Sequence, residues 1–271
     1  MARRLVQAGH EVLVWNRTAE KAAALVEDGA ILAESPADVA SRGDAVITMV
    51  ADPAALSVVV EGPNGIAAGA DASVTVIEMS TVGPAAITRL RPLLPEETGL
   101  LDAPVLGSLS EAEDGALKIF VGGPEPLVNR WTPLLSALGD PLHVGPLGAG
   151  SAAKLVANTT LFGVLATLGE ALALGQGLGL SPDTTFDVLA TTPLAAQAER
   201  RRAAVESGEY PRRFALSLGV KDLDLIVEAA AEAGVDLRVT AAAHAWLAEA
   251  EAAGLGDRDY SAVLAWILGP R

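Results

Sequence analysis

The sequence predicts an α/β domain built on a parallel sheet, followed by an all-α domain that begins with a long helix. Three observations lead to this prediction. Short apolar runs typical of buried strands alternate with helical segments up to residue 147, no strand pattern follows, and 271 residues suffice for two domains. We therefore predict a first domain over residues 1–147 and a second over residues 148–271.

The first half opens within a helix, over residues 3–8, that ends at Gly9. The apolar run 12–15 is then predicted to be a strand buried on both faces, and Thr18 can cap the helix that follows it. Further strands are predicted over 45–52, 73–80, 100–105 and 118–123, with helices over 19–28, 53–60 and 84–94. This alternation is typical of a parallel sheet covered on both sides.

The second half contains only helical patterns. Pro146 and Gly148 mark the junction, and residues 149–178 read as one long helix rich in Ala, Gly and Leu. Further helices are predicted over 182–190, 195–206, 217–233, 238–253 and 259–267.

The composition excludes several functions. Acidic residues outnumber basic ones by 34 to 19, and a net charge of −15 disfavours nucleic acid and anionic membranes as partners. The absence of cysteine rules out disulfides and thiolate catalysis, and the three scattered histidines indicate no metal site. No uninterrupted apolar run approaches a membrane span and no signal-peptide core occurs, so we expect a cytoplasmic protein.

The stretch GAGSAAKLVAN, residues 148–158, is the most informative part of the chain. It places Lys154 just inside a helix that opens at a glycine-rich turn, and Asn158 lies four residues on, on the same helical face. The positive end of the helix dipole disfavours a second positive charge, which lowers the expected pKa of this lysine. Such an amine can donate a proton to a developing alkoxide. Taken alone, however, a single lysine is more often a solvated surface residue.

The beginning of the expected sheet is not in the sequence. A nucleotide-binding α/β unit normally opens with a strand, a glycine-rich turn and a helix, whereas this chain begins inside what resembles that first helix. Either the pyrophosphate-binding turn is absent, or the start has been placed at an internal methionine, which the intact downstream pattern favours.

Five segments, in order, resemble the β-hydroxyacid dehydrogenases, the family of 3-hydroxyisobutyrate dehydrogenase, tartronate semialdehyde reductase and the 6-phosphogluconate dehydrogenase-like enzymes. They are MARRLVQAGHEVLVWNRT (1–18), EMSTVGP (78–84), LDAPVLGSLSEAEDGAL (101–117), GAGSAAKLVAN (148–158) and FALSLGVKDLDLIVEAA (214–230). The resemblance implies a Rossmann-like sheet domain without its first strand and glycine loop. It also implies NAD(P)-dependent oxidation of a small 3-hydroxy acid, or reduction of the semialdehyde, in a homodimer or homotetramer.

The resemblance implies that Lys154 is the catalytic general acid and base, and that Asn158 and Ser80 contact the substrate. Gly107 and Ser108 fall in the expected substrate loop, but the family's serine is replaced by Leu106, and Ser108 can substitute for it from two positions on. This departure puts the substrate's identity in doubt more than the reaction class.

The cofactor residues are expected at the carboxyl ends of strands. An acidic residue after the strand at 12–15 would bind the ribose of NAD, whereas Arg17 suits the 2′-phosphate of NADP, with Asn16 and Thr18 adding hydrogen bonds. NADP(H) is therefore favoured over NAD(H). The resemblance adds a further group of cofactor contacts, namely Val50, Ala51, Thr81, Phe214 and Lys221. As plain sequence, Lys221 and Asp222 are typical of a surface ion pair.

Two alternatives remain open. One is an imine or carbonyl reductase of the same superfamily, although imine reductases usually lack the lysine found here at position 154. The other is a non-catalytic dimeric pseudoenzyme that has lost its pyrophosphate turn.

Overall fold

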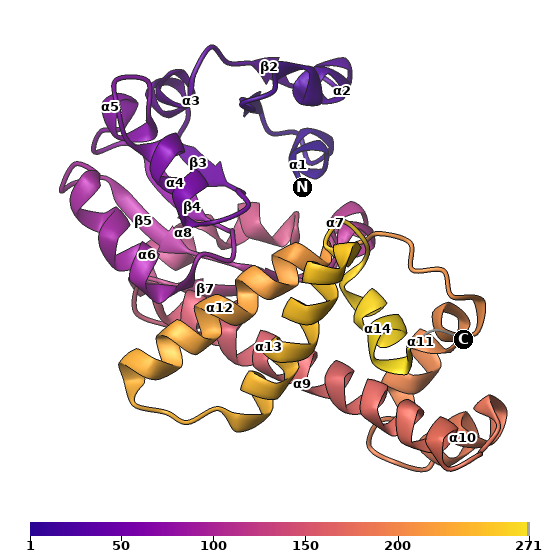
Figure 1. The fold of residues 1–271 in the computed structure, drawn as a ribbon. Coiled ribbons are helices and arrows are strands. Elements are labelled where there is room, and N and C mark those ends of the chain that lie inside the picture. Colours follow the sequence, from indigo (N-terminus) through magenta and orange to yellow (C-terminus); the bar gives the residue numbers. More distant parts are fainter. Residues whose placement is uncertain (270–271) are drawn as a thin grey trace. The chain divides into compact units, whose positions relative to one another are not determined.

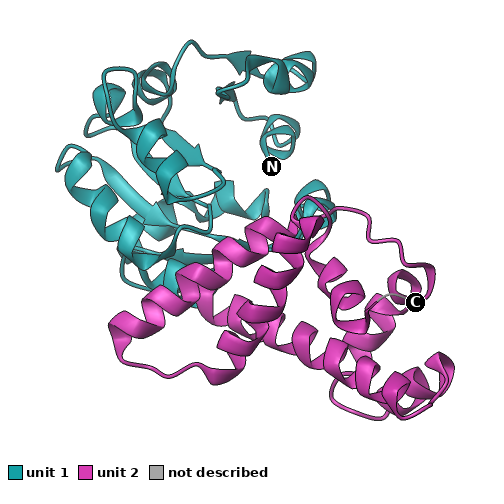
Figure 2. Ribbon diagram, viewed as in Figure 1, with its two compact units in different colours: residues 1–154 teal, residues 155–271 magenta. Residues whose placement is uncertain are grey.

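The computed structural model describes residues 1–269 and divides the chain into two compact units, Met1–Lys154 and Leu155 onward (Figure 2). The last two residues of the predicted second domain, 270 and 271, lie outside the described residues. The boundary between the units falls inside a long helix, whereas the boundary predicted at 147/148 precedes that helix. Each unit has its own hydrophobic core.

The first unit contains a two-stranded sheet and a six-stranded sheet. β1 (Leu13–Val14) and β2 (Ile31–Leu32) pair in parallel and form the small sheet. The larger sheet has the order β3-β4-β5-β7-β6, and β8 also pairs with β7. Its strands are β3 (Ala45–Thr48), β4 (Thr75–Glu78), β5 (Gly99–Asp102), β6 (Val105–Leu106), β7 (Leu117–Gly122) and β8 (Gly139–Gly145).

The larger sheet is parallel through β3, β4 and β5 and between β7 and β8, as the alternating pattern predicts. β7 nevertheless runs antiparallel to β5 and β6. Only residues 107–116 separate β6 from β7, and a parallel crossover needs a dozen or more residues, so β7 turns back along β6. The strand expected at 12–15 is shorter than predicted, and only Val14 of it is buried.

The helices of the first unit flank the strands (Figure 1). They are α1 (Ala2–Gln7), α2 (Ala23–Glu27), α3 (Pro36–Arg42), α4 (Pro53–Val60), α5 (Ile66–Gly69), α6 (Gly83–Leu90), α7 (Leu109–Asp114) and α8 (Glu125–Ser136), with 3₁₀ turns at Ala19–Ala22 and Arg91–Leu93. The predicted side-chain cap from Thr18 is not formed; instead, the backbone N–H of Thr18 donates to Asn16 Oδ1 at 2.9 Å.

In its described residues, the second unit contains helices and no strand, as predicted. It contains most of α9 (Ala149–Gly177), then α10 (Pro182–Leu189), α11 (Ala195–Ser207), α12 (Leu216–Ala233), α13 (Arg238–Ala250) and α14 (Val263–Leu268), with a π-helical turn at Glu251–Leu255 and a 3₁₀ turn at Tyr260–Ala262. Phe162, Leu168 and Leu216 are among the fully buried side chains of its core.

From Leu155 onward, α9 forms part of that core. By length and composition it is apolar enough to cross a membrane, with a mean hydropathy of 1.4 over its most apolar window, although polar residues such as Lys154, Asn158 and Glu170 interrupt it. Half of that window is buried inside the protein, where Leu165 and Leu172 pack in the core. A core helix has this burial pattern, so the composition of α9 is weak evidence for a membrane.

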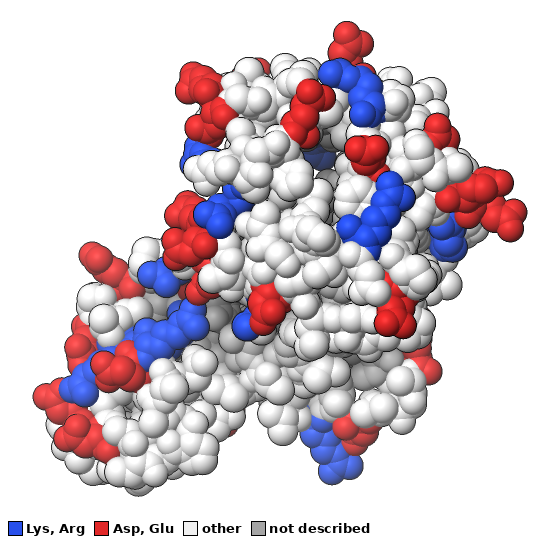
Figure 3. Space-filling view, turned by 180° about the vertical axis from the view of Figure 1, so that it is seen from behind, with Lys and Arg blue, Asp and Glu red and all other residues white. Residues whose placement is uncertain are grey.

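Acidic and basic side chains are interspersed over the face drawn in Figure 3, and no continuous basic patch gathers there.

Candidate active site

The carboxyl ends of β3 and β4 are joined by hydrogen bonds through residues that the sequence assigns to the site. The backbone N–H of Val50 donates to Ser80 Oγ at 2.8 Å, so the segment after β3 is held against the segment after β4. The N–H of Ser80 donates in turn to Glu78 Oε1 at 2.9 Å. Ala51 and Thr81 are the next residues of these two segments. Ligands of open parallel sheets bind at this edge.

Glu78 is the buried centre of these contacts, and the sequence analysis did not single it out. Its side chain is fully buried at the end of β4, and Thr48 Oγ1 also donates to Oε1, at 3.4 Å. Oε2 is buried without a hydrogen-bond partner. Burial, with a smaller contribution from Asp102, raises the pKa of Glu78 to about 7, against the hydrogen bonds from Ser80 and Thr48. The signal in the sequence was a carboxyl group ending an otherwise apolar strand.

Asp102 ends the neighbouring strand β5, paired in register with Glu78, and is also fully buried. Its carboxylate accepts two backbone N–H groups from the start of α9, Gly148 N–H at 2.8 Å and Ser151 N–H at 2.6 Å. Burial raises the pKa of this carboxyl group, and the two N–H donors oppose the shift. Asp102 thus links β5 to the first turn of α9 through these two hydrogen bonds.

Lys154 follows Ser151 by three residues, nearly one helical turn. Lys154 is 8% exposed and therefore buried, whereas a single lysine is more often solvated at the surface. Asn158 lies one turn further along the same face of α9.

In the second unit, Asn158 is fixed by a carboxylate. Its Nδ2 donates to Asp222 Oδ2 at 2.7 Å, and Lys221 Nζ lies 2.5 Å from Asp222 Oδ1. Only the amide nitrogen of asparagine can donate to a carboxylate, so this bond fixes which way the amide points. Asp222 is buried, which corrects the expectation of a surface pair at 221 and 222. Asn158 Oδ1 is buried and has no hydrogen-bond partner.

Phe214 is held by the residues that precede α14. Its backbone N–H and that of Arg213 donate to Asp259 Oδ2, at 3.2 and 3.0 Å. Its ring meets the ring of Tyr260 edge-on, with centroids 5.7 Å apart. These contacts give the predicted cofactor residue a defined orientation within the second unit.

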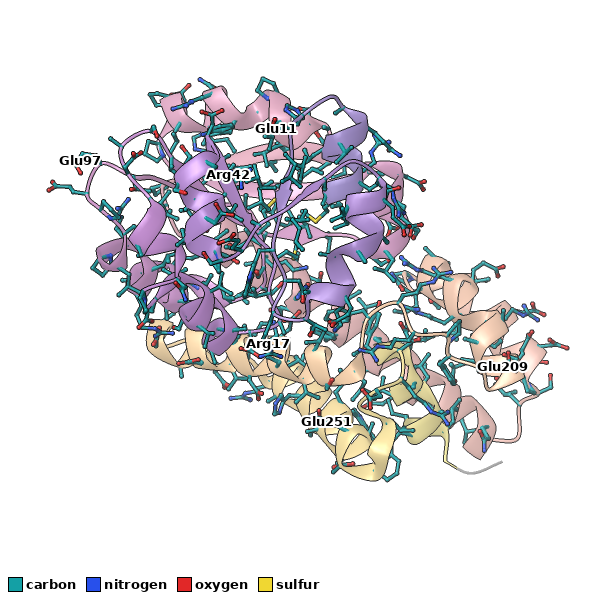
Figure 4. The ribbon with its side chains drawn as sticks, turned by 90° about the horizontal axis from the view of Figure 1, so that it is seen from above. Glu11, Arg17, Arg42, Glu97, Glu209 and Glu251 are labelled. Carbon is teal, nitrogen blue, oxygen red and sulfur yellow. The ribbon has the colours of Figure 1, made fainter. Side chains whose placement is uncertain are left out.

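The turn after β1 carries the predicted determinants of cofactor choice. Asn16 Oδ1 accepts the Thr18 N–H, which closes the turn and leaves the Asn16 amide N–H groups as donors. Arg17, labelled in Figure 4, is exposed at this turn.

The loop between β6 and α7 contains Gly107 and Ser108, the two residues predicted to contact the substrate. Gly107 has φ = +141°, and a Cβ there would lie 2.8 Å from the Leu117 side chain, so the position requires glycine. Ser108 Oγ and Ser108 N–H both donate to Glu111 Oε2, at 2.6 and 2.7 Å. These bonds lower the pKa of Glu111 to about 2, so a negative charge stands beside the serine.

Comparison with known proteins gives consistent matches along the chain. Residues 1–148 match the family described as the NAD binding domain of 6-phosphogluconate dehydrogenase. Residues 148–267 match the family described as NAD-binding of NADP-dependent 3-hydroxyisobutyrate dehydrogenase.

Individual relatives match over nearly the whole chain. 2-(Hydroxymethyl)glutarate dehydrogenase of Eubacterium barkeri is 34% identical over 97% of this chain and 89% of its own length. Chloroplastic glyoxylate/succinic semialdehyde reductase 2 of Arabidopsis thaliana is 33% identical over 97% of this chain and 75% of its own. The solved structure of 3-hydroxyisobutyrate dehydrogenase from Mycobacterium tuberculosis aligns with a TM-score of 0.88 at 27% identity, covering 99% of this chain and 94% of that one.

Proposed function

The chain belongs to the β-hydroxyacid dehydrogenase family and is an NAD(P)-dependent dehydrogenase or reductase, and on this premise we propose that it interconverts a small 3-hydroxy acid and the corresponding semialdehyde, with NADP(H) as the preferred cofactor. Lys154 is the proposed general acid and base. The observation that carries the proposal is the position of this largely buried amine, less than one turn after the point where α9 is tied to the sheet.

In the proposed reaction, Lys154 as an ammonium group donates a proton to the substrate oxygen during reduction and takes it back during oxidation. Asn158 complements this role, because its Nδ2 is committed to Asp222 and its Oδ1 is left to accept a hydrogen bond. A substrate hydroxyl is the donor that this acceptor fits. Ser80 is the proposed third contact, and its Oγ is held in place because it accepts the Val50 N–H.

A nicotinamide cofactor supplies or accepts the hydride in this family. The turn at residues 16–18 fits the phosphorylated ribose of NADP, because the exposed Arg17 guanidinium can pair with a phosphate and the Asn16 amide retains its donors. Val50, Ala51, Thr81, Phe214 and Lys221 are the further proposed cofactor contacts.

The names of the relatives favour an acid or an aldehyde acid as substrate, since they act on 2-(hydroxymethyl)glutarate, glyoxylate and succinic semialdehyde. One observation favours a second candidate, a neutral carbonyl compound or an imine. Ser108 is engaged by the ionised Glu111, and a carboxylate there repels an anionic substrate group. The negative charge of Glu111 is therefore the feature that favours a neutral substrate over an anionic one.

We also propose that the protein assembles into a homodimer or homotetramer through its helical unit. Leu174 of α9, Leu178 just after α9 and Val188 of α10 are large apolar side chains exposed to solvent. Exposed apolar surface of this kind is what a subunit contact would cover. Light scattering coupled to size-exclusion chromatography measures the assembly, and a monomer at micromolar concentration contradicts the proposal.

The test of the function is a substrate panel with both cofactors. It contains glyoxylate, succinic semialdehyde, 3-hydroxyisobutyrate and neutral aldehydes and imines of matched size, each with NADPH and NADH. The chain is assayed as printed and with an added N-terminal strand and glycine-rich turn. The proposal predicts the highest kcat/KM for a carboxylated substrate with NADPH, and turnover of neutral substrates alone supports the second candidate. If neither protein binds NADPH or turns over, the non-catalytic alternative holds.

A further inference from the structure

The start of α9 looks like an anion-binding site, but the anion there is the protein's own. Residues 148–153, Gly-Ala-Gly-Ser-Ala-Ala, follow β8 and open a 29-residue helix, which is the glycine spacing of a dinucleotide-binding turn. A helix N-terminus with free N–H groups attracts anions. Here the carboxylate of Asp102 accepts the N–H groups of Gly148 and Ser151, so the capping group comes from the centre of the sheet.

The glycines around Asp102 explain how the helix comes so close to the strands. A Cβ on Gly150 would lie 2.4 Å from the carbonyl oxygens of both Asp102 and Phe120. A Cβ on Gly122 would lie 2.3 Å from Asp102 Oδ1 and 2.7 Å from the Gly150 nitrogen. These distances are shorter than any normal contact, so both positions require glycine for the helix to dock. The first turn of α9 is therefore packed against β5 and β7 without room to shift.

The arrangement fixes the helix in three ways. Two charge-assisted hydrogen bonds give the first turn a definite position along its axis. The negative charge faces the positive end of the helix dipole, where it is stabilising. The side chain that makes these bonds is fully buried, so water does not compete for it.

Lys154 lies three residues beyond Ser151 on this fixed turn, so its backbone position is set by the same contact. A catalytic group misplaced by about 1 Å can lose about 100-fold in rate. We propose that Asp102 is a positioning residue, which holds the first turn of α9 on the sheet and thereby sets the place of the Lys154 amine. This inference rests on the proposed role of Lys154.

The main test is the isosteric variant Asp102→Asn in the full chain. An asparagine oxygen accepts one of the two N–H groups, and its NH₂ then opposes the other, so the turn loses half of its anchor. We expect kcat to fall about 10-fold or more while KM for NADPH stays within about twofold. We also expect the alkaline limb of the pH–kcat profile to move to lower pH, because a negative charge that favours the ammonium form is gone.

Two further variants separate positioning from loss of stability. Ser181→Ala removes the side chain that caps α10 by accepting the Thr184 N–H, and it should leave kcat and the pH profile unchanged. Gly150→Ala pushes the helix start away from the sheet and keeps the Asp102 charge. This variant should lower kcat without moving the alkaline limb of the pH–kcat profile. If Asp102→Asn does not fold, Gly150→Ala still tests whether the position of the helix start controls kcat.

Amide hydrogen exchange gives a readout that does not depend on activity. In Asp102→Asn, exchange in the peptide covering 146–156 should become about 10-fold faster or more, with exchange in the later turns of α9 unchanged. If the wild-type protein turns over and Asp102→Asn has the same kcat and pH profile, the positioning role is overturned and the proposed function stands. If the wild-type protein does not turn over, the function fails, and unchanged exchange in 146–156 would overturn the anchoring role as well.

Discussion

Replacing Glu78 with glutamine should change how the stability of the protein depends on pH. The pKa of Glu78 is about 7 in the folded protein, against 4.5 for an ordinary glutamate. Between these pH values the folded state binds more protons than the unfolded state, so the free energy of unfolding falls as pH rises. The difference of about 2.5 units at 1.36 kcal/mol each corresponds to a cost of about 3 kcal/mol, complete above pH 7. Glutamine keeps an oxygen for the Ser80 N–H and removes the ionisation.

Urea unfolding followed by circular dichroism, at pH 5 and at pH 8.5, measures this effect. The stability of Glu78→Gln relative to wild type should rise by about 2 to 3 kcal/mol between the two pH values. Glu111→Gln is the matched control, because the pKa of Glu111 is lowered to about 2 and its contribution is lost only as pH falls below 4.5. The control should show no such trend. A relative stability of Glu78→Gln that is the same at both pH values would refute the reasoning.

Three other substitutions test separate parts of the structure. Arg17→Ser should raise KM for NADPH by about 10-fold or more and leave KM for NADH within about twofold; equal changes for both cofactors would exclude a 2′-phosphate contact. Asn158→Ala should lower kcat/KM for the substrate about 10-fold or more with NADPH affinity unchanged in a fluorescence titration, and lost NADPH affinity would contradict its substrate role. Phe162→Ala should lower the free energy of unfolding by about 3 to 5 kcal/mol in urea, since the ring is fully buried; a change below about 1 kcal/mol would count against this core.

The sequence was sufficient to predict those helices and strands whose pattern of apolar residues was long and periodic. The helices of the second half and the strands β3, β4 and β5 came from apolar runs and helical spacing that tertiary packing did not override. The five motifs, in their order along the chain, predicted the family, and the comparisons confirm that prediction.

The sequence was insufficient to predict several strands and helices that are short or exposed. β2 consists of two exposed residues, Ile31 and Leu32, and β8 contains Pro141 and has no buried residue, so neither gives an apolar signal. The helices α3 and α5 are seven and four residues long, below the length at which helical periodicity is evident.

The supporting residues of the site were missed for a different reason. Asp102 and Asp222 matter because of partners at Gly148, Ser151 and Asn158, and local patterns carry no information on contacts so distant in sequence. A buried polar residue at the end of an apolar strand, as at Asp102, was the available signal.

The most direct test of the account is the turnover of Lys154→Ala, measured with the best substrate of the panel and NADPH. Loss of a general acid predicts a kcat lower by about 100-fold or more, with folding and NADPH binding intact. Lys118→Ala, which removes an exposed lysine paired with Asp140, is the matched control and should retain wild-type kcat. A Lys154→Ala protein that turns over at the wild-type rate would contradict the assignment of the proton transfer to this amine.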